Sequence, residues 1–163
     1  MYVLYLFLII SVSSLEASHD QFQKVSDSIL CRSCGSDFLS TDAIISKLSP
    51  VSLYSFNDTI FNTDEILVQV LPKDFILQFP IITAESSACL GMGEWVEDDY
   101  WFPGYQWKPC GCSICGTFIG LMFEPIDPFS VVTPKQFFGL IPAHLVGKNF
   151  TDSLIKYPAI TKH

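Results

Sequence analysis

Six cysteines carry the most distinctive chemistry of this chain, because four of them form two close pairs. Cys31 and Cys34 make one Cys-x-x-Cys pair, and Cys112 and Cys115 make a second pair far downstream. Two such pairs, each on a tight turn, supply the four thiolates of a tetrahedral zinc site. Four thiolate ligands leave no coordination position for water or substrate. The pattern therefore predicts a structural Zn²⁺ ion rather than a catalytic one.

Cys89 and Cys110 remain as an even pair once these four ligands are assigned. A disulfide between them is the most economical assignment. Two alternatives stay open at this point. Cys110 could replace Cys112 as a metal ligand, or all six cysteines could pair as three disulfides in an oxidising compartment.

A second group of residues that could form a functional site is the string Tyr100-Trp-Phe-Pro-Gly-Tyr-Gln-Trp107. Its two tryptophans flank a Pro-Gly turn, so two large flat side chains lie at the ends of one reversal. Tryptophan is costly to leave in water and is often not fully buried, which favours two walls of a half-open ligand pocket. The alternative is that Trp101, Trp107 and the aromatic residues between them fill a sheet interface as core.

The elements that must position these residues have a β pattern. Short runs rich in aromatic and β-branched residues are each bounded by Pro, Gly, Asn or Asp. Their spacing favours antiparallel sheets over βαβ units. The predicted strands are residues 53–56, 65–71, 75–79 and 117–123.

One short helical turn is expected near the C-terminus of the folded unit. Thr133 and Pro134 offer an N-cap residue and a proline at the first helical position. Residues 135–138 follow, and Gly139 is a stop signal. We expect one of the two phenylalanines in this turn to pack on the sheet.

The N-terminus reads as a secretory signal. An almost entirely apolar run of 15 residues gives way to small residues, and Ala17 is the expected last residue removed. The run is shorter than the ~20 residues of a membrane span. No Lys or Arg precedes it, so an uncleaved anchor remains an alternative. We expect a signal peptide over 1–17, a linker over 18–27, one folded domain over 28–146 and a tail over 147–163.

The charge balance and the glycosylation motifs limit the classes of partner that we expect. The chain has 17 Asp and Glu against 9 Lys and Arg, with no basic cluster. Nothing would neutralise a phosphate backbone, which excludes nucleic acid as an expected partner. Asn57-Asp-Thr59 and Asn149-Phe-Thr151 are N-glycosylation acceptor triplets. We expect a secreted, extracellular monomer with no membrane partner in its mature form.

The order of these motifs resembles the CULT domain, the thalidomide-binding domain of cereblon, which also has secreted stand-alone members. The likeness covers about residues 30–145: Cys-x-x-Cys, a β-rich insert, Trp-Phe-Pro-Gly-Tyr-x-Trp, Cys-x-x-Cys and Ile-Gly-x-x-Phe. Thr-Pro-Lys-Gln-Phe-Phe-Gly-Leu at 133–140 continues it. The resemblance implies a β-tent, which is an all-β fold of two antiparallel sheets pinned by a structural zinc ion.

The resemblance also implies a cage of three tryptophans that holds a cyclic imide such as glutarimide. Trp101 and Trp107 match the first two cage positions, Phe123 matches an aromatic residue at the pocket floor, and Asn57 matches a rim asparagine. Leu121 stands where the family has its third tryptophan. Leucine keeps an apolar wall but loses a ring contact worth roughly 0.5–1.5 kcal/mol. Weaker imide binding or a different ligand is therefore expected.

These observations predict a secreted, zinc-stabilised, non-enzymatic protein that binds a cyclic imide-like small molecule or a modified protein terminus. Leu121 prompts a second hypothesis, a protein-interaction module with a degenerate pocket. A third is an enzyme similar to the B-type methionine sulfoxide reductases, which share two zinc-binding Cys-x-x-Cys pairs. Cys89 and Cys110 would then be the nucleophile and the resolving cysteine.

Overall fold

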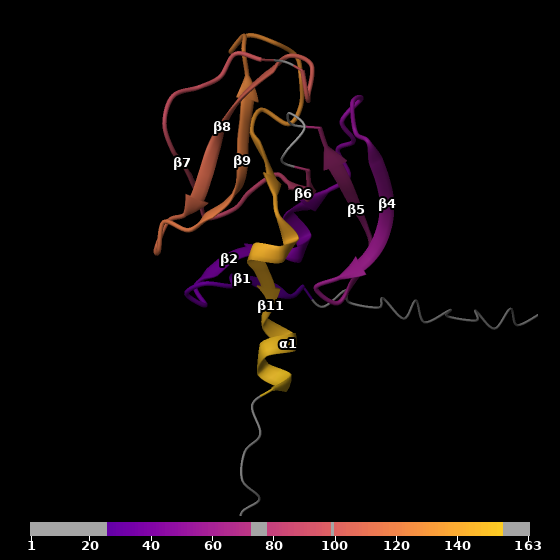
Figure 1. The fold of residues 1–163 in the computed structure, drawn as a ribbon, viewed down its shortest axis with the longest axis vertical. Helices are drawn as coiled ribbons and strands as arrows, with labels where there is room; N and C mark the ends of the chain where they lie inside the picture. The colour runs from indigo at the N-terminus through magenta and orange to yellow at the C-terminus, as the bar shows by residue number, and fades with distance from the viewer. Residues whose placement is uncertain (1–25, 73–77, 99, 155–163) are drawn as a thin grey trace, which may run out of the picture.

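The computed structural model describes residues 26–72, 78–98 and 100–154. These residues confirm the predicted all-β fold of two antiparallel sheets (Figure 1). The small sheet contains β1 (Ser28–Cys31), β2 (Asp37–Ser40) and β11 (Leu145–Gly147). The large sheet contains β3 (Ile44–Ile45), β4 (Tyr54–Ile60), β5 (Thr63–Leu71), β6 (Phe79–Ala84), β7 (Cys89–Gly91), β8 (Tyr105–Cys112), β9 (Phe118–Pro125) and β10 (Phe137–Leu140).

Strand order brings the first and last described strands together. The small sheet has the order β11-β1-β2, so the first and last strands are neighbours. The large sheet has the order β4-β5-β6-β10-β9-β8-β7, and β3 also pairs with β6. Figure 1 shows β4 and β5 on one side of the molecule, β7 to β9 on the other, and the small sheet below them. Short 3-10 helices at Thr41–Ala43 and Pro142–His144 and the helix α1 (Lys148–Ser153) lie between or beside these strands.

Alternation of side chains along the central strands creates two hydrophobic clusters on opposite faces of the large sheet. Phe138 and Leu140 of β10 belong to the cluster between the sheets, whereas Phe137 belongs to the other. The inter-sheet cluster takes residues from both sheets and includes Ile29, Phe38, Leu39, Ile66, Val68, Ile82, Ala84, Ile119, Phe138, Leu140 and Leu145. The second cluster contains Leu71, Ile81, Trp101, Phe102, Tyr105, Leu121, Phe123, Phe137 and Ile141, and is called the aromatic cluster below.

The helical turn predicted at 133–138 is wrong. Phe137 begins strand β10, which pairs with β9 on one side and β6 on the other. Phe137 and Phe138 are both buried, and only an extended strand directs consecutive side chains to opposite faces. Burial of these two rings therefore outweighs the local capping signal. The short C-terminal helix is α1, further along the chain.

Three of the four predicted strands overlap observed strands over most of their length. Residues 65–71 lie within β5, while β4 and β9 each begin one residue later than predicted and extend further. The strand predicted at 75–79 falls largely outside the described residues, as do the signal peptide, most of the linker and the end of the tail. Within the described ranges, no helix has the length and apolarity needed to cross a membrane.

Candidate metal centre and aromatic site

The four cysteines of the two Cys-x-x-Cys pairs meet where the two sheets come together. Cys31 ends β1 and Cys34 lies in the turn to β2, so this pair belongs to the small sheet. Cys112 ends β8 and Cys115 lies in the turn to β9, so that pair belongs to the large sheet. All four sulfur atoms lie within 4.8 Å of one another. This cluster, the metal centre, can hold a metal ion.

Two of the sulfur–sulfur separations at the metal centre match the edge of a tetrahedral thiolate site. The Sγ atoms of Cys31 and Cys115 are 3.8 Å apart, and those of Cys34 and Cys112 are also 3.8 Å apart. A zinc–sulfur bond of about 2.3 Å gives a tetrahedron whose sulfur–sulfur edge is about 3.8 Å. A disulfide would need a separation of about 2.0 Å. The four thiol groups therefore form a donor set that fits a tetrahedral metal ion such as zinc.

Both turns of the metal centre have the same backbone geometry. In each, the amide of the first cysteine donates to the carbonyl of the residue five positions on, at 2.9 Å. Gly35 and Gly116, which follow the second cysteine of each pair, donate to the carbonyl of the first at 2.8 Å. Both glycines have φ of +72°, the left-handed region that glycine tolerates best. Sequence analysis missed them, although both pairs read Cys-x-x-Cys-Gly.

The surroundings of the sulfur atoms shift the thiol pKa values of Cys31, Cys112 and Cys115 in different directions. Burial raises the pKa of Cys31 to about 11, so its thiolate is disfavoured without a compensating positive charge. Burial also acts to raise the pKa of Cys112, but hydrogen bonds with the Ser36 side chain and backbone amides lower it to about 6. Hydrogen bonds with Thr117 lower the pKa of Cys115. Part of the site is thus organised for thiolates, which a divalent ion would hold together.

Cys89 and Cys110 form a disulfide next to this centre. Their sulfur atoms are 2.04 Å apart and their Cα atoms 5.5 Å apart, and the bond joins β7 to β8. Both residues are buried in the inter-sheet cluster. Cys110 is therefore bonded to Cys89 and does not replace Cys112 in the metal centre.

The register of β8, β9 and β10 places several predicted pocket residues on one face. Trp107 pairs with Phe123, and Phe123 pairs with Phe137, so these three side chains share a face. Leu121 lies two residues from Phe123 and points to the same side. Trp101, from the loop before β8, packs against Trp107 with ring centroids 4.9 Å apart. The structure thus brings four of the five predicted ligand-binding residues together.

The two tryptophans are closely packed in this arrangement. Trp101 is only 5% exposed, and its indole N–H donates a 2.7 Å hydrogen bond to the carbonyl of Pro72. Its backbone carbonyl accepts a hydrogen bond from the Ser49 hydroxyl. Trp107 packs against the same cluster but is only partly buried, and Leu121 is buried within the cluster. The cage residues therefore contact one another directly.

The two predicted glycosylation residues lie on the surface, and Asn57 is also the predicted residue at the pocket rim. Asn57 is exposed on β4, an edge strand, and its side-chain amide donates to the Glu65 carboxylate at 2.7 Å. Asn57 is not a member of the aromatic cluster. Asn149 is exposed in the first turn of α1.

An all-β fold whose two sheets meet at a four-cysteine metal centre defines the structural class of this chain, and sequence comparison places it near cereblon. The chain is 31% identical to cereblon of Drosophila melanogaster over 111 residues, which are 68% of this chain and 16% of that protein. It is 44% identical to cereblon of Drosophila willistoni over 48 residues and 48% identical to that of Drosophila grimshawi over 40 residues.

These two shorter matches cover 29% and 24% of this chain and 8% and 6% of the respective relatives. The matching region is therefore a small part of each cereblon chain. No family model matches the chain. The homology, though weak, shows that the chain contains a cereblon-like domain.

Proposed function

We propose that this chain is a secreted, zinc-stabilised, non-enzymatic binding domain of the CULT type. Its ligand is a small molecule, or a modified protein terminus, that carries a cyclic imide, cyclic amide or related heterocycle. The observation that carries the proposal is the gathering of Trp101, Trp107 and Phe123 on one face of the large sheet. Similarity to cereblon gives independent support.

Zinc in this proposal has a structural role. Cys31, Cys34, Cys112 and Cys115 would be its four thiolate ligands, and four such ligands would leave no position for a substrate. The ion would fix the end of β8, the strand that carries Trp107. Secretion is supported by the buried Cys89–Cys110 disulfide, because such bonds persist in oxidising compartments. Monomeric state remains part of the proposal.

The hydrogen bond between Trp101 and Pro72 suggests how an imide would bind. It pairs one donor with one acceptor at the edge of the aromatic cluster. An imide offers the same two groups side by side, an N–H and a carbonyl. Its N–H can donate to the Pro72 carbonyl while its carbonyl accepts from the Trp101 indole. Ligand entry requires these groups to separate, which together with Leu121 lowers the affinity.

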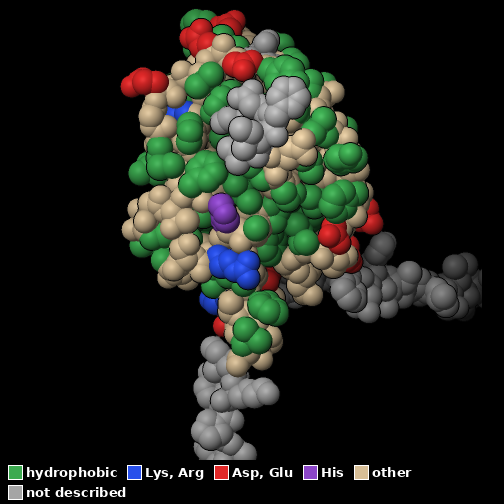
Figure 2. All heavy atoms as spheres, in the orientation of Figure 1, with side chains coloured by type: hydrophobic (Ala, Val, Ile, Leu, Met, Phe, Trp, Pro, Cys, Tyr) green, Lys and Arg blue, Asp and Glu red, His purple; other side chains and the backbone are tan. Residues whose placement is uncertain are grey.

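Close packing of the cage favours a second candidate, a protein-interaction module without a small ligand. Trp101 and Trp107 are in contact, and Leu121 fills space within the same cluster. Large apolar side chains are also exposed elsewhere, and Phe129 and Val131 are each 93% exposed. Figure 2 shows hydrophobic side chains over much of one face. Such surface fits contact with another protein.

A fluorescence titration separates the two candidates. Glutarimide and N-methylglutarimide would be titrated into the protein and into the variants Trp101→Phe and Trp95→Phe. We expect saturable quenching by glutarimide at millimolar concentration or below, and weaker binding of the N-methyl compound. Trp101→Phe removes the indole donor and should weaken binding about fivefold.

Trp95→Phe is the matched control, because Trp95 contacts Lys108 outside the aromatic cluster, with the ammonium 4.2 Å from the ring centroid. The affinity of the Trp95→Phe variant for glutarimide should equal that of the unmodified protein. Absence of saturable quenching at millimolar glutarimide, in the unmodified protein and in Trp95→Phe alike, would rule out the proposed ligand and favour the interaction module.

A further inference from the structure

A cavity lined by residues distant in sequence from the tryptophans has the features of a second ligand site. It has a volume of about 650 Å³, which lies within the range of about 300–1,000 Å³ found for small-molecule pockets. Its walls come from the β4–β5 turn, β11, α1 and the segments beside β1. The lining residues that matter here are Asp27, Arg32, Phe61, Leu145, Gly147 and Phe150.

Asp27 is the polar group that this cavity leaves unpartnered. The residue is 5% exposed, and its Oδ1 accepts a hydrogen bond from the backbone N–H of Asn149 at 3.3 Å. Its Oδ2 is buried and has no hydrogen-bond partner among the described residues. A Cβ added at Gly147 would lie 3.2 Å from this oxygen, so Gly147 packs directly beside it. A buried carboxylate oxygen without a donor is costly unless something pairs with it.

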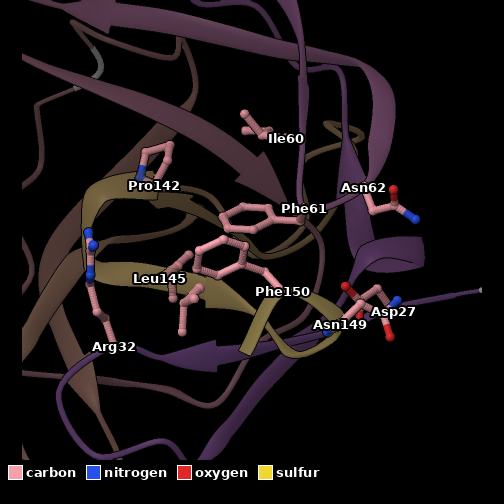
Figure 3. Close-up of a pocket in the computed structure, with 11 residues that line it drawn as sticks. Asp27, Arg32, Ile60, Phe61, Asn62, Pro142, Leu145, Asn149 and Phe150 are labelled. Atoms are coloured by element: carbon pink, nitrogen blue, oxygen red, sulfur yellow. Dashed lines mark hydrogen bonds between the residues drawn. The ribbon is translucent and has the colours of Figure 1, made fainter. Parts of the chain in front are cut away.

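The rest of the cavity wall shows what kind of partner fits. Figure 3 shows the rings of Phe61 and Phe150 between Asp27 on one side and Arg32 on the other. The aromatic faces and Leu145 suit an apolar body, and they also attract a cation that lies over them. A calcium ion would need six to eight oxygen ligands, which these apolar walls do not supply. An organic ammonium group on an apolar body meets both requirements.

We propose that this cavity binds a small amphipathic amine. Its ammonium group donates to Oδ2 of Asp27, and its apolar part lies between Phe61 and Phe150. Arg32 donates to the carbonyl of Ala143 through one nitrogen at 3.1 Å and keeps its charge at the far end of the cavity. An amine that also carries a terminal carboxylate would use this second end. The site is separate from the aromatic cluster and does not depend on imide binding.

The test compares two probes of the same shape, phenethylammonium and the neutral 2-phenylethanol. The full chain would be refolded oxidatively with zinc so that no glycan is attached at Asn149, which lines the cavity. Calorimetry gives affinities, and amide resonances of Phe61 and Gly147 report the location. We expect phenethylammonium to bind at millimolar concentration or tighter and the alcohol about tenfold or more weakly. Indole resonances of the aromatic cluster should not move.

Three variants test the roles of the residues. Asp27→Asn keeps the size of the side chain and should abolish the preference for the amine over the alcohol. Phe150→Ala truncates an exposed residue of the cavity wall and should weaken the binding of both probes about threefold or more. Glu97→Gln removes one exposed acidic group outside the cavity and should bind both probes as the unmodified protein does.

Equal affinity for the two probes, or absence of saturable shifts at Gly147, would overturn the proposal. Unchanged amine preference in a folded Asp27→Asn variant would overturn it as well. Should Asp27→Asn fail to fold, the probe comparison and Phe150→Ala still decide. Shifts confined to indole resonances would assign the amine to the aromatic cluster instead and would also contradict the proposal.

Discussion

Gly120 shows how a single residue without a side chain permits the packing of the large sheet. An added Cβ at this position would overlap the backbone carbonyl oxygen of Gly139 and lie 3.0 Å from the Cα of Leu140. Both contacts are with the backbone of the neighbouring strand β10, which cannot move without breaking its pairing. The glycine of the Ile-Gly-x-x-Phe motif is therefore a steric requirement of the sheet.

Gly120→Ala should lower the free energy of unfolding by about 3 kcal/mol or more, because backbone must shift to admit the methyl group. Gly91→Ala is the matched control. Its Cβ would meet only the far end of the flexible Lys108 side chain, which can move aside. The control should change stability by less than about 1 kcal/mol. Urea unfolding at fixed zinc concentration measures both, and equally small effects would contradict the steric explanation.

The two Cys-x-x-Cys-Gly turns are the elements on which the metal centre depends. Each turns the chain so that both cysteine side chains face the same point, and each ends with a glycine at φ of +72°. A Cβ at Gly35 or Gly116 would meet nothing within 4 Å. Any effect of substitution there must come from the backbone conformation and not from crowding.

Gly35→Ala and Gly116→Ala should therefore each lower the free energy of unfolding by about 1–2 kcal/mol, the cost of a left-handed residue with a Cβ. Asparagine at the same positions should lower the free energy of unfolding by less, because it adopts the left-handed conformation more readily than alanine does. Denaturant unfolding measures the change in stability, and a chromophoric chelator added to the zinc-loaded protein measures the rate of metal release. Alanine variants as stable as the unmodified protein would show that the turns do not require glycine.

How much the sequence predicts depends on whether a signal is local. The metal centre is predictable because each ligand pair lies on one short turn, and β5 is predictable from its branched residues. The strand at Phe137 is not, because pairing with β6 and β9 outweighs the Thr-Pro signal before it. The contact of Trp101 with Pro72 and the cavity at Asp27 depend on tertiary structure alone. Asp27 itself falls within the predicted linker.

At the scale of the whole molecule, the metal centre joins two sheets that share one hydrophobic cluster. The small sheet contributes few large apolar residues, among them Ile29, Phe38 and Leu39. A bound ion would form four metal–sulfur bonds, two to the cysteine pair of the small sheet and two to that of the large sheet. The free energy of metal binding then becomes part of the free energy of folding. The aromatic cluster lies on the opposite face, so metal loss would affect it through β8 and β9.

The most direct test of this account is the metal content of the oxidised, folded chain by native mass spectrometry, before and after treatment with a strong zinc chelator. The account predicts one zinc ion per chain, one disulfide and four cysteines free of disulfide bonds. Chelation should abolish the near-ultraviolet circular dichroism of the tryptophans. A folded protein without zinc, with all six sulfur atoms in disulfides, would contradict it.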